Sequence, residues 1–215
     1  LFSRSARART PDRTLQLTTS DEPESSTPDW LLLEDGPLIA VCKPVGLLTE
    51  GPEYLPSMVR EVKEWLRKKY GKAGRVYLGI PHRLDRVTSG VLVFGKNSKV
   101  AARLAEQFHD RKVQKLYWTL LDHKPEPAFG ELIDWLLKDS KTARSAIVEA
   151  GTPRAREARL AYRTLGQVGE RWLVEVRPLT GRTHQIRVQF AGHGCPVAGD
   201  ARYGGKPWPD DAPEQ

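Results

Sequence analysis

Apolar runs and amphipathic stretches alternate along the chain, and their periods predict its secondary structure. The longest continuous apolar run, LIAVC at residues 38–42, is typical of a buried strand. Residues 57–70 place Val59, Val62 and Leu66 at the spacing of one helical face. Because residues three and four apart share a face of an α-helix, this spacing predicts an amphipathic helix that buries one side.

The rest of the chain adds a second long helix and further strands. Apolar residues recur at helical spacing over residues 98–109. Strand-like runs lie at residues 90–96, 114–121, 157–165 and 171–178, and a short helix is expected at 183–191. Because several strands follow one another without a helix between them, the pattern predicts an α+β fold: a mixed, largely antiparallel sheet with flanking helices.

The first 29 residues differ in composition from the rest. They are rich in Pro, Ser, Thr, Arg and acidic residues, which predicts a disordered tail at 1–29 and a folded domain at 30–215. The whole chain has 34 basic and 27 acidic residues and a net charge of +7. The tail holds four of the basic and five of the acidic residues, so the expected domain has 30 and 22, a net charge of +8.

This positive charge narrows the classes of partner. A basic surface attracts polyanions, of which nucleic acid is the commonest and an anionic membrane surface is the rival. No apolar stretch approaches the length that crosses a bilayer, so a membrane-spanning role is not expected. The two cysteines, Cys42 and Cys195, form no CxxC pair, and the histidines lack ligand spacing, so no metal site is expected. GKNS at 95–98 lacks the preceding glycine of a phosphate-binding loop.

One acidic residue stands among basic residues just before a predicted strand. In PHRLDRVTSG, Asp85 has Arg83 and Arg86 as close neighbours in sequence. Nearby positive charge favours the ionised carboxylate, which can act as a nucleophile or as a base. The same residues also fit a structural loop held by ion pairs, and spacing alone favours that reading.

Two further segments carry candidate binding residues. In RPLTGRTHQIRVQF, Arg182 and Arg187 offer planar donor groups for phosphate or carboxylate near a predicted helix N-terminus. A capped surface helix with solvated arginines is the alternative. In KLYWTL, Tyr117 and Trp118 point to opposite faces of a strand. Either ring could stack on a base or pack into the core.

Taken together, these motifs resemble the RluA-like family of RNA pseudouridine synthases. HRLDRVTSG and LTGRTHQIR, with KPVGLL before them, KLYWTL between them and GCPVAGDARYGG after them, occur in the family's order over residues 37–206. The resemblance implies a catalytic domain with an RNA-binding cleft across its sheet. It also implies isomerisation of selected uridines in RNA to pseudouridine without a metal or organic cofactor.

The family's residue roles carry over to matching positions. The resemblance implies that Asp85 is the catalytic residue, that Tyr117 stacks on the target base and that Arg182 pairs with Asp85. Arg83 would fill the space that a flipped nucleotide leaves. Three further residues, Lys43, Arg86 and Arg187, are expected to lie at the substrate RNA.

We therefore expect a cytoplasmic, monomeric enzyme that flips specific uridines out of ribosomal or transfer RNA and isomerises them. A non-catalytic RNA-binding module or RNA chaperone with the same fold is the alternative. An unrelated hydrolase that uses Asp85 is a further one, although no second carboxylate or oxyanion motif stands nearby. After KPVGLL many relatives have a His-Pro pair where this chain reads TEGPEY, so the sequence leaves the target RNA open.

Overall fold

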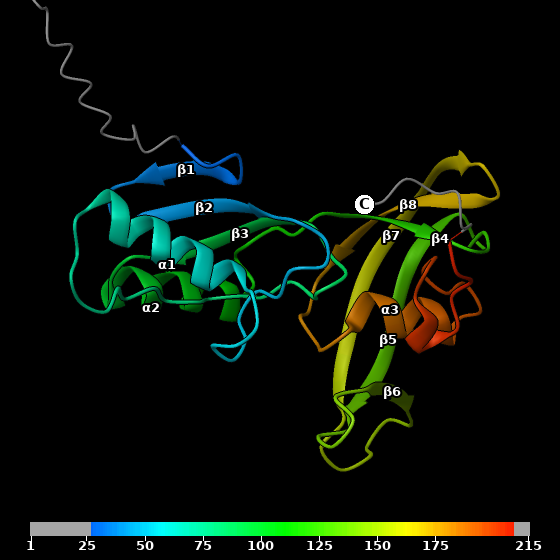
Figure 1. Cartoon of the computed structure of the whole chain (residues 1–215). Coiled ribbons are helices and arrows are strands. Elements are labelled where there is room, and N and C mark those ends of the chain that lie inside the picture. The colour runs from blue at the N-terminus through cyan, green and yellow to red at the C-terminus, as the bar shows by residue number, and fades with distance from the viewer. Residues whose placement is uncertain (1–26, 209–215) are drawn as a thin grey trace, which may run out of the picture.

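The computed structural model describes residues 27–208 and arranges them around two antiparallel sheets (Figure 1). The α+β class that the pattern predicted is confirmed, with strands paired within two separate sheets. Most of the predicted tail, residues 1–26, lies outside the described residues. Within the described part, no helix has the length and apolarity needed to cross a membrane.

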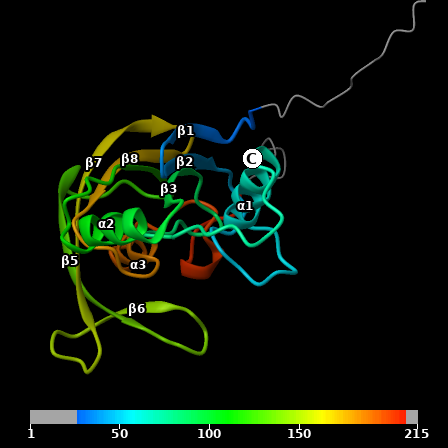
Figure 2. The same cartoon turned by 90° about the vertical axis from the view of Figure 1, so that its left-hand side faces the viewer.

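The N-terminal half of the fold is a three-stranded sheet with two helices on one face. Its strands pair in the order β1 (Leu31–Asp35), β2 (Leu38–Lys43) and β3 (Gly90–Gly95). The helices α1 (Met58–Lys69) and α2 (Ser98–His109) lie beneath this sheet, as Figures 1 and 2 show from two directions. Both helices lie where the apolar spacing predicted them.

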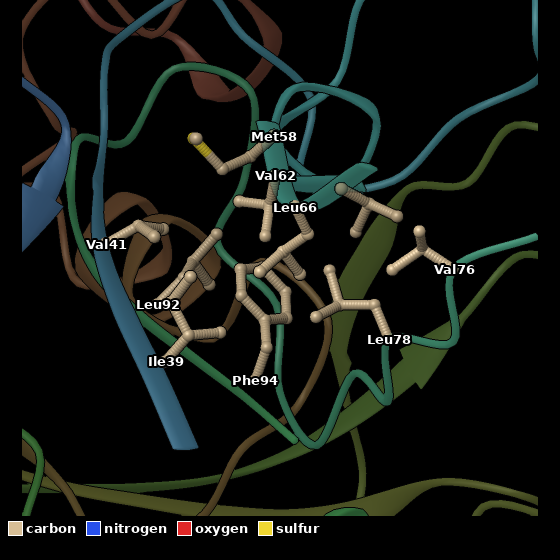
Figure 3. Packing of buried hydrophobic residues seen from close by; sticks show 10 residues of the cluster. Ile39, Val41, Met58, Val62, Leu66, Val76, Leu78, Leu92 and Phe94 are labelled. Atoms are coloured by element: carbon tan, nitrogen blue, oxygen red, sulfur yellow. The ribbon is translucent and has the colours of Figure 1, made fainter. Parts of the chain in front are cut away.

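The core of this half forms where the inward faces of β2 and β3 meet α1 (Figure 3). Ile39 and Val41 alternate with less buried neighbours on β2, and Leu92 and Phe94 do the same on β3, as the period of a strand requires. Val62 of α1, like these four residues, is completely buried. The apolar helical face and the alternating strand faces therefore close on one another.

The C-terminal half is a five-stranded sheet with one helix against it. Its strands are β4 (Tyr117–Leu121), β5 (Phe129–Lys138), β6 (Ser145–Val148), β7 (Arg156–Val168) and β8 (Arg171–Pro178). They pair in the order β4-β8-β7-β5-β6, and every pair is antiparallel. The short helices α3 (Gln185–Gly192) and η1 (Ala201–Tyr203) follow. Phe190 of α3 packs with Tyr162 and with the buried residues of β4 and β8.

Three strands were not predicted from the sequence. In β1 and β5, apolar residues occupy both faces, as exposed Leu32 and Leu33 and exposed Ile133 show. Apolar and polar residues therefore do not alternate along these strands, and the sequence shows no period of two there. The third strand, β6, has four residues, which is too few for a periodic signal. The predicted helix at 183–191 begins two residues late because His184 has the left-handed backbone conformation, with φ of 54°.

Helix α2 approaches β3 closely because two glycines face it. Gly79 and Gly95 exchange backbone hydrogen bonds of 2.8 and 3.1 Å. A Cβ atom on Gly79 would overlap the Cβ atom of Ala101, and one on Gly95 would lie 2.6 Å from the Ala101 backbone nitrogen. Both positions therefore require the absence of a side chain if α2 is to keep its distance from the sheet.

We predict that Gly79→Ala lowers the free energy of unfolding by about 1–3 kcal/mol, because the added methyl group forces the helix away from the sheet. Gly74→Ala is the matched control: nothing lies within 4 Å of its added methyl group. The control should be neutral or slightly stabilising. Urea unfolding of both variants measures the difference, and equal stabilities would contradict the close packing.

Candidate active site

Asp85 lies in the loop before β3, and hydrogen bonds fix this loop to the KPVGLL turn. The Gly46 N–H donates to the Arg86 carbonyl at 2.8 Å, and Arg86 Nε donates to the Gly46 carbonyl at 2.8 Å. The Thr49 hydroxyl donates to the Leu84 carbonyl at 2.8 Å and accepts from the Leu84 N–H at 3.0 Å. The backbone on both sides of Asp85 is thus tied to a second segment.

His82 ties the same loop to the sheet. Its Nε2 accepts a hydrogen bond of 3.0 Å from the Val93 N–H of β3, and its ring stacks on Phe108 of α2 with centroids 4.4 Å apart. Burial, with a smaller contribution from the charge of Lys115, lowers the pKa of His82 from 6.5 to about 4. His82 is therefore a neutral acceptor near pH 7, and its role here is to position the loop.

The ionic partner of Asp85 is Arg187, which lies in α3. Arg187 Nη1 is 3.0 Å from Asp85 Oδ2, while its Nε and Nη2 bind the two carboxylate oxygens of Asp200 at 2.6 and 2.8 Å. Burial opposes the charge of Arg187, but the hydrogen bonds to Asp200 and Asp85 outweigh it and raise the pKa of Arg187 above its ordinary value. One guanidinium therefore holds two carboxylates from distant segments.

The expected pairing of Asp85 with Arg182 is wrong. Arg182 precedes α3, and its Nε donates to the Glu157 carbonyl on β7 at 2.9 Å. Within residues 27–208 it makes no ion pair with Asp85 or with another carboxylate. The left-handed turn at His184 separates the two arginines, so that Arg182 faces β7 and Arg187 faces the Asp85 loop. Both lie in one motif, and sequence spacing could not decide between them.

Tyr117 and Lys43 lie within electrostatic reach of Asp85. Burial raises the pKa of Tyr117, and the negative charge of Asp85 adds to this effect. Burial lowers the pKa of Lys43, whereas the charge of Asp85 opposes that shift. Lys43 is completely buried, and its Nζ donates to the Pro44 and Leu47 carbonyls at 2.7 and 2.8 Å. Lys43 therefore holds the KPVGLL turn and also contributes positive charge beside Asp85.

The two arginines of HRLDR make no ion pair with Asp85 among the described residues. The Arg83 side chain is 71% exposed, and its Nη2 lies 2.9 Å from Glu50. Arg86 is also exposed, although its Nε is held by the Gly46 carbonyl. Arg83 thus lies at the surface, where its charge is paired with that of Glu50. Asp85 itself is one-third exposed, and its Oδ1 accepts no hydrogen bond from the described residues.

Sequence reasoning missed three members of the site. His184 Nε2 is 3.9 Å from Asp85 Oδ2, and burial lowers the pKa of His184. The Tyr203 hydroxyl lies 2.8 Å from His184 Nδ1 and accepts a 3.0 Å hydrogen bond from the Ser145 N–H. Asp200 fixes Arg187. Asp200 and Tyr203 both belong to GCPVAGDARYGG, so the motif resemblance was the only signal for them.

The described residues include no group of three or more His, Cys, Asp or Glu side chains placed to hold a metal ion.

We predict that acid destabilises the protein partly through His82. Its folded pKa of about 4 lies below the ordinary 6.5, so the unfolded state binds the proton more tightly. The contribution of neutral His82 to the free energy of unfolding is complete above pH 6.5 and is lost as the pH falls towards 4. Urea midpoints at pH 7 and pH 5 should differ less for His82→Gln than for the wild type. His109→Gln, which alters an exposed residue, should retain the wild-type difference.

Arg187→Ala should lower the free energy of unfolding by about 3 kcal/mol, because Asp200 and Asp85 then lack their shared cation. Arg163→Ala is the control, since it removes an exposed arginine that lies 3.6 Å from Glu175. It should cost less than about 1 kcal/mol. Chemical denaturation compares the two variants. A small loss for Arg187→Ala would mean that the bridge does not hold the site together.

The chain is similar to known proteins over most of its length. The family model described as RNA pseudouridylate synthase matches residues 37–192. The ribosomal large subunit pseudouridine synthase C of Rickettsia felis is 33% identical over 181 residues, which cover 84% of this chain and 57% of that protein. The mitochondrial pseudouridylate synthase RPUSD4 of Xenopus tropicalis is 32% identical over 79% of this chain and 58% of its own.

A solved structure agrees with these matches. Human RNA pseudouridylate synthase domain containing 4 superposes with a TM-score of 0.69 at 28% identity, covering 86% of this chain and 72% of that one. This chain spans less than two thirds of the length of the two relatives just described. The family model matches well over half of the chain, and with relatives above 30% identity it shows that the chain belongs to the RNA pseudouridylate synthase family, as its RluA-like motifs predicted.

Proposed function

We propose that this protein is an RNA pseudouridine synthase and that Asp85 is its catalytic residue. The observation that carries the proposal is the state of the Asp85 carboxylate. Oδ2 is held by Arg187 at 3.0 Å, whereas Oδ1 is free of hydrogen bonds from the described residues. The carboxylate is thus oriented through one oxygen and open to a substrate through the other.

The reaction requires an ionised carboxylate at this position. Pseudouridine formation breaks the N1–C1′ bond, turns the uracil and joins it again through C5. Asp85 serves this reaction by adding to C1′, by adding to C6 or by removing the 2′ proton, and each route needs the anion. Arg187 favours that anion through its positive charge. Within this proposal, Arg187 takes the role that the family resemblance gave to Arg182.

The uridine has to leave its helix before it reaches Asp85. Flipping costs a few kcal/mol in lost stacking and pairing. Arg83, which is exposed beside Asp85 in sequence, is placed to stack in the gap. Tyr117 lies close enough to Asp85 for the two to interact electrostatically, so its ring is the candidate to stack on the flipped base. Lys43 holds the KPVGLL turn, and Arg86 ties the loop that carries Asp85 to that turn.

The substrate that we propose is ribosomal RNA. Several relatives, including the Rickettsia felis protein, are named for the large ribosomal subunit, which favours ribosomal over transfer RNA. A monomeric state and a cytoplasmic location stay predictions from the sequence. The alternative, a non-catalytic RNA-binding module, would bind the same RNA without isomerising it.

We predict that Asp85→Asn keeps the fold and the RNA affinity but lowers turnover about a thousandfold or more, because a neutral amide is a poor nucleophile and a poor base. The measurement is tritium release from ribosomal RNA labelled at C5 of uridine. Asp35→Asn, at the exposed last residue of β1, is the control and should retain full activity.

Each outcome decides a separate point. Appreciable turnover by Asp85→Asn would remove Asp85 from the mechanism. Binding of the labelled RNA by the wild type without release of tritium would favour the RNA-binding module instead.

A further inference from the structure

A basic pocket lies beside the Asp85 centre, and the mechanism above makes no use of it. It has a volume of about 320 Å³ and lies between the β5–β6 hairpin, the start of β7 and the turn before α3. Its charged lining consists of Lys138, Arg154, Arg156 and Arg182, and no acidic side chain lines it. We call these four residues and the space between them the arginine pocket.

The charges of the arginine pocket are not neutralised within the described part of the chain. None of its four basic side chains forms an ion pair with a described carboxylate. Arg182 is anchored through Nε to the Glu157 carbonyl, and neither of its Nη atoms is hydrogen-bonded there. Burial lowers the pKa of Arg182, and the neighbouring charges of Arg156 and Arg111 lower it further. Positive charges that repel one another in this way favour an anion between them.

Two arginines of this basic region occupy backbone positions that suit glycine better. Arg154, in the pocket, has φ of 68°, and Arg111, whose charge acts on Arg182, has φ of 59°. L-residues rarely adopt this left-handed region. Arg111 follows the C-cap of α2, where glycine is the usual residue. An arginine there is unfavourable for the backbone, which indicates a use for its side chain.

The arginine pocket is joined to the Asp85 centre by a single turn. The Ser145 hydroxyl, which lines the pocket, donates to the Thr183 carbonyl at 2.9 Å. Thr183 also lines the pocket, and the next residue, His184, lies 3.9 Å from Asp85. An anion in the pocket and a base at Asp85 would therefore contact adjacent residues of the protein.

We infer that the arginine pocket binds phosphate groups of the RNA strand that flanks the target uridine, an inference that rests on the proposed function. Guanidinium groups match the geometry of phosphate oxygens and bind them through two hydrogen bonds. The charged lining of the pocket is entirely positive, and phosphate contacts of this kind contribute affinity and register. Arg182 is then an RNA-binding residue, which explains its position away from Asp85.

Arg154→Gly and Arg111→Gly test this inference without risk to the fold. Glycine favours the left-handed conformation, so both variants should melt at or above the wild-type temperature. Binding of a short fluorescent oligouridylate should weaken about two- to fivefold in each. The slope of log affinity against log salt concentration should become shallower by about 0.7 for each phosphate that the variant no longer binds. Ala143→Gly is the matched control: Ala143 has φ of 52°, lies between β5 and β6 and has no charge.

The control should keep the wild-type affinity and slope. A wild-type salt slope in Arg154→Gly, which alters a residue that lines the pocket, overturns the inference. Failure of the proposed function is seen separately, as absence of tritium release by the wild-type protein on ribosomal RNA. If the wild type releases tritium while the arginine variants keep its slope, the function stands and the phosphate site does not.

Discussion

The guanidinium of Arg187 is the group on which the candidate site depends. It binds two carboxylates, from the loop before β3 and from the segment after α3. Asp200, almost fully buried, takes two of its hydrogen bonds, whereas the more exposed Asp85 takes one. One guanidinium therefore binds two carboxylates, and Asp85 receives the smaller share of its hydrogen bonds. The single hydrogen bond from Arg187 fixes the orientation of Asp85 and leaves one of its oxygens open.

The same bridge connects the two halves of the fold. Asp85 follows α1 and precedes β3, while Arg187 and Asp200 belong to the half built on the five-stranded sheet. A bridge between separate halves needs rigid supports on both sides. Thr49 and His82 provide them for the Asp85 loop. Thr49 lies in TEGPEY, where the chain departs from many relatives, and its hydroxyl binds both backbone groups of Leu84. The altered segment thus retains a structural role beside the site.

The arginine pocket extends this arrangement along the turn before α3. His184 divides the motif into two parts, because its left-handed backbone directs Arg182 towards β7 and leaves Arg187 on the helix. The first part faces the basic pocket and the second faces Asp85. A single short segment therefore serves both the proposed chemistry at the uridine and the proposed binding of the phosphate groups that flank it in the RNA.

The sequence by itself determined the two long helices, the central strands and the α+β class, because each of these depends on a local period of apolar residues. It also proposed Asp85 and Tyr117 as site residues, through motifs that resemble a family. It missed β1 and β5, whose two faces are both partly apolar, and it joined Asp85 to Arg182 instead of Arg187. Only the tertiary structure decided that pairing. The partners lie 102 positions apart, and the choice between two nearby arginines depends on one backbone angle at His184 and on the docking of α3 against the Asp85 loop.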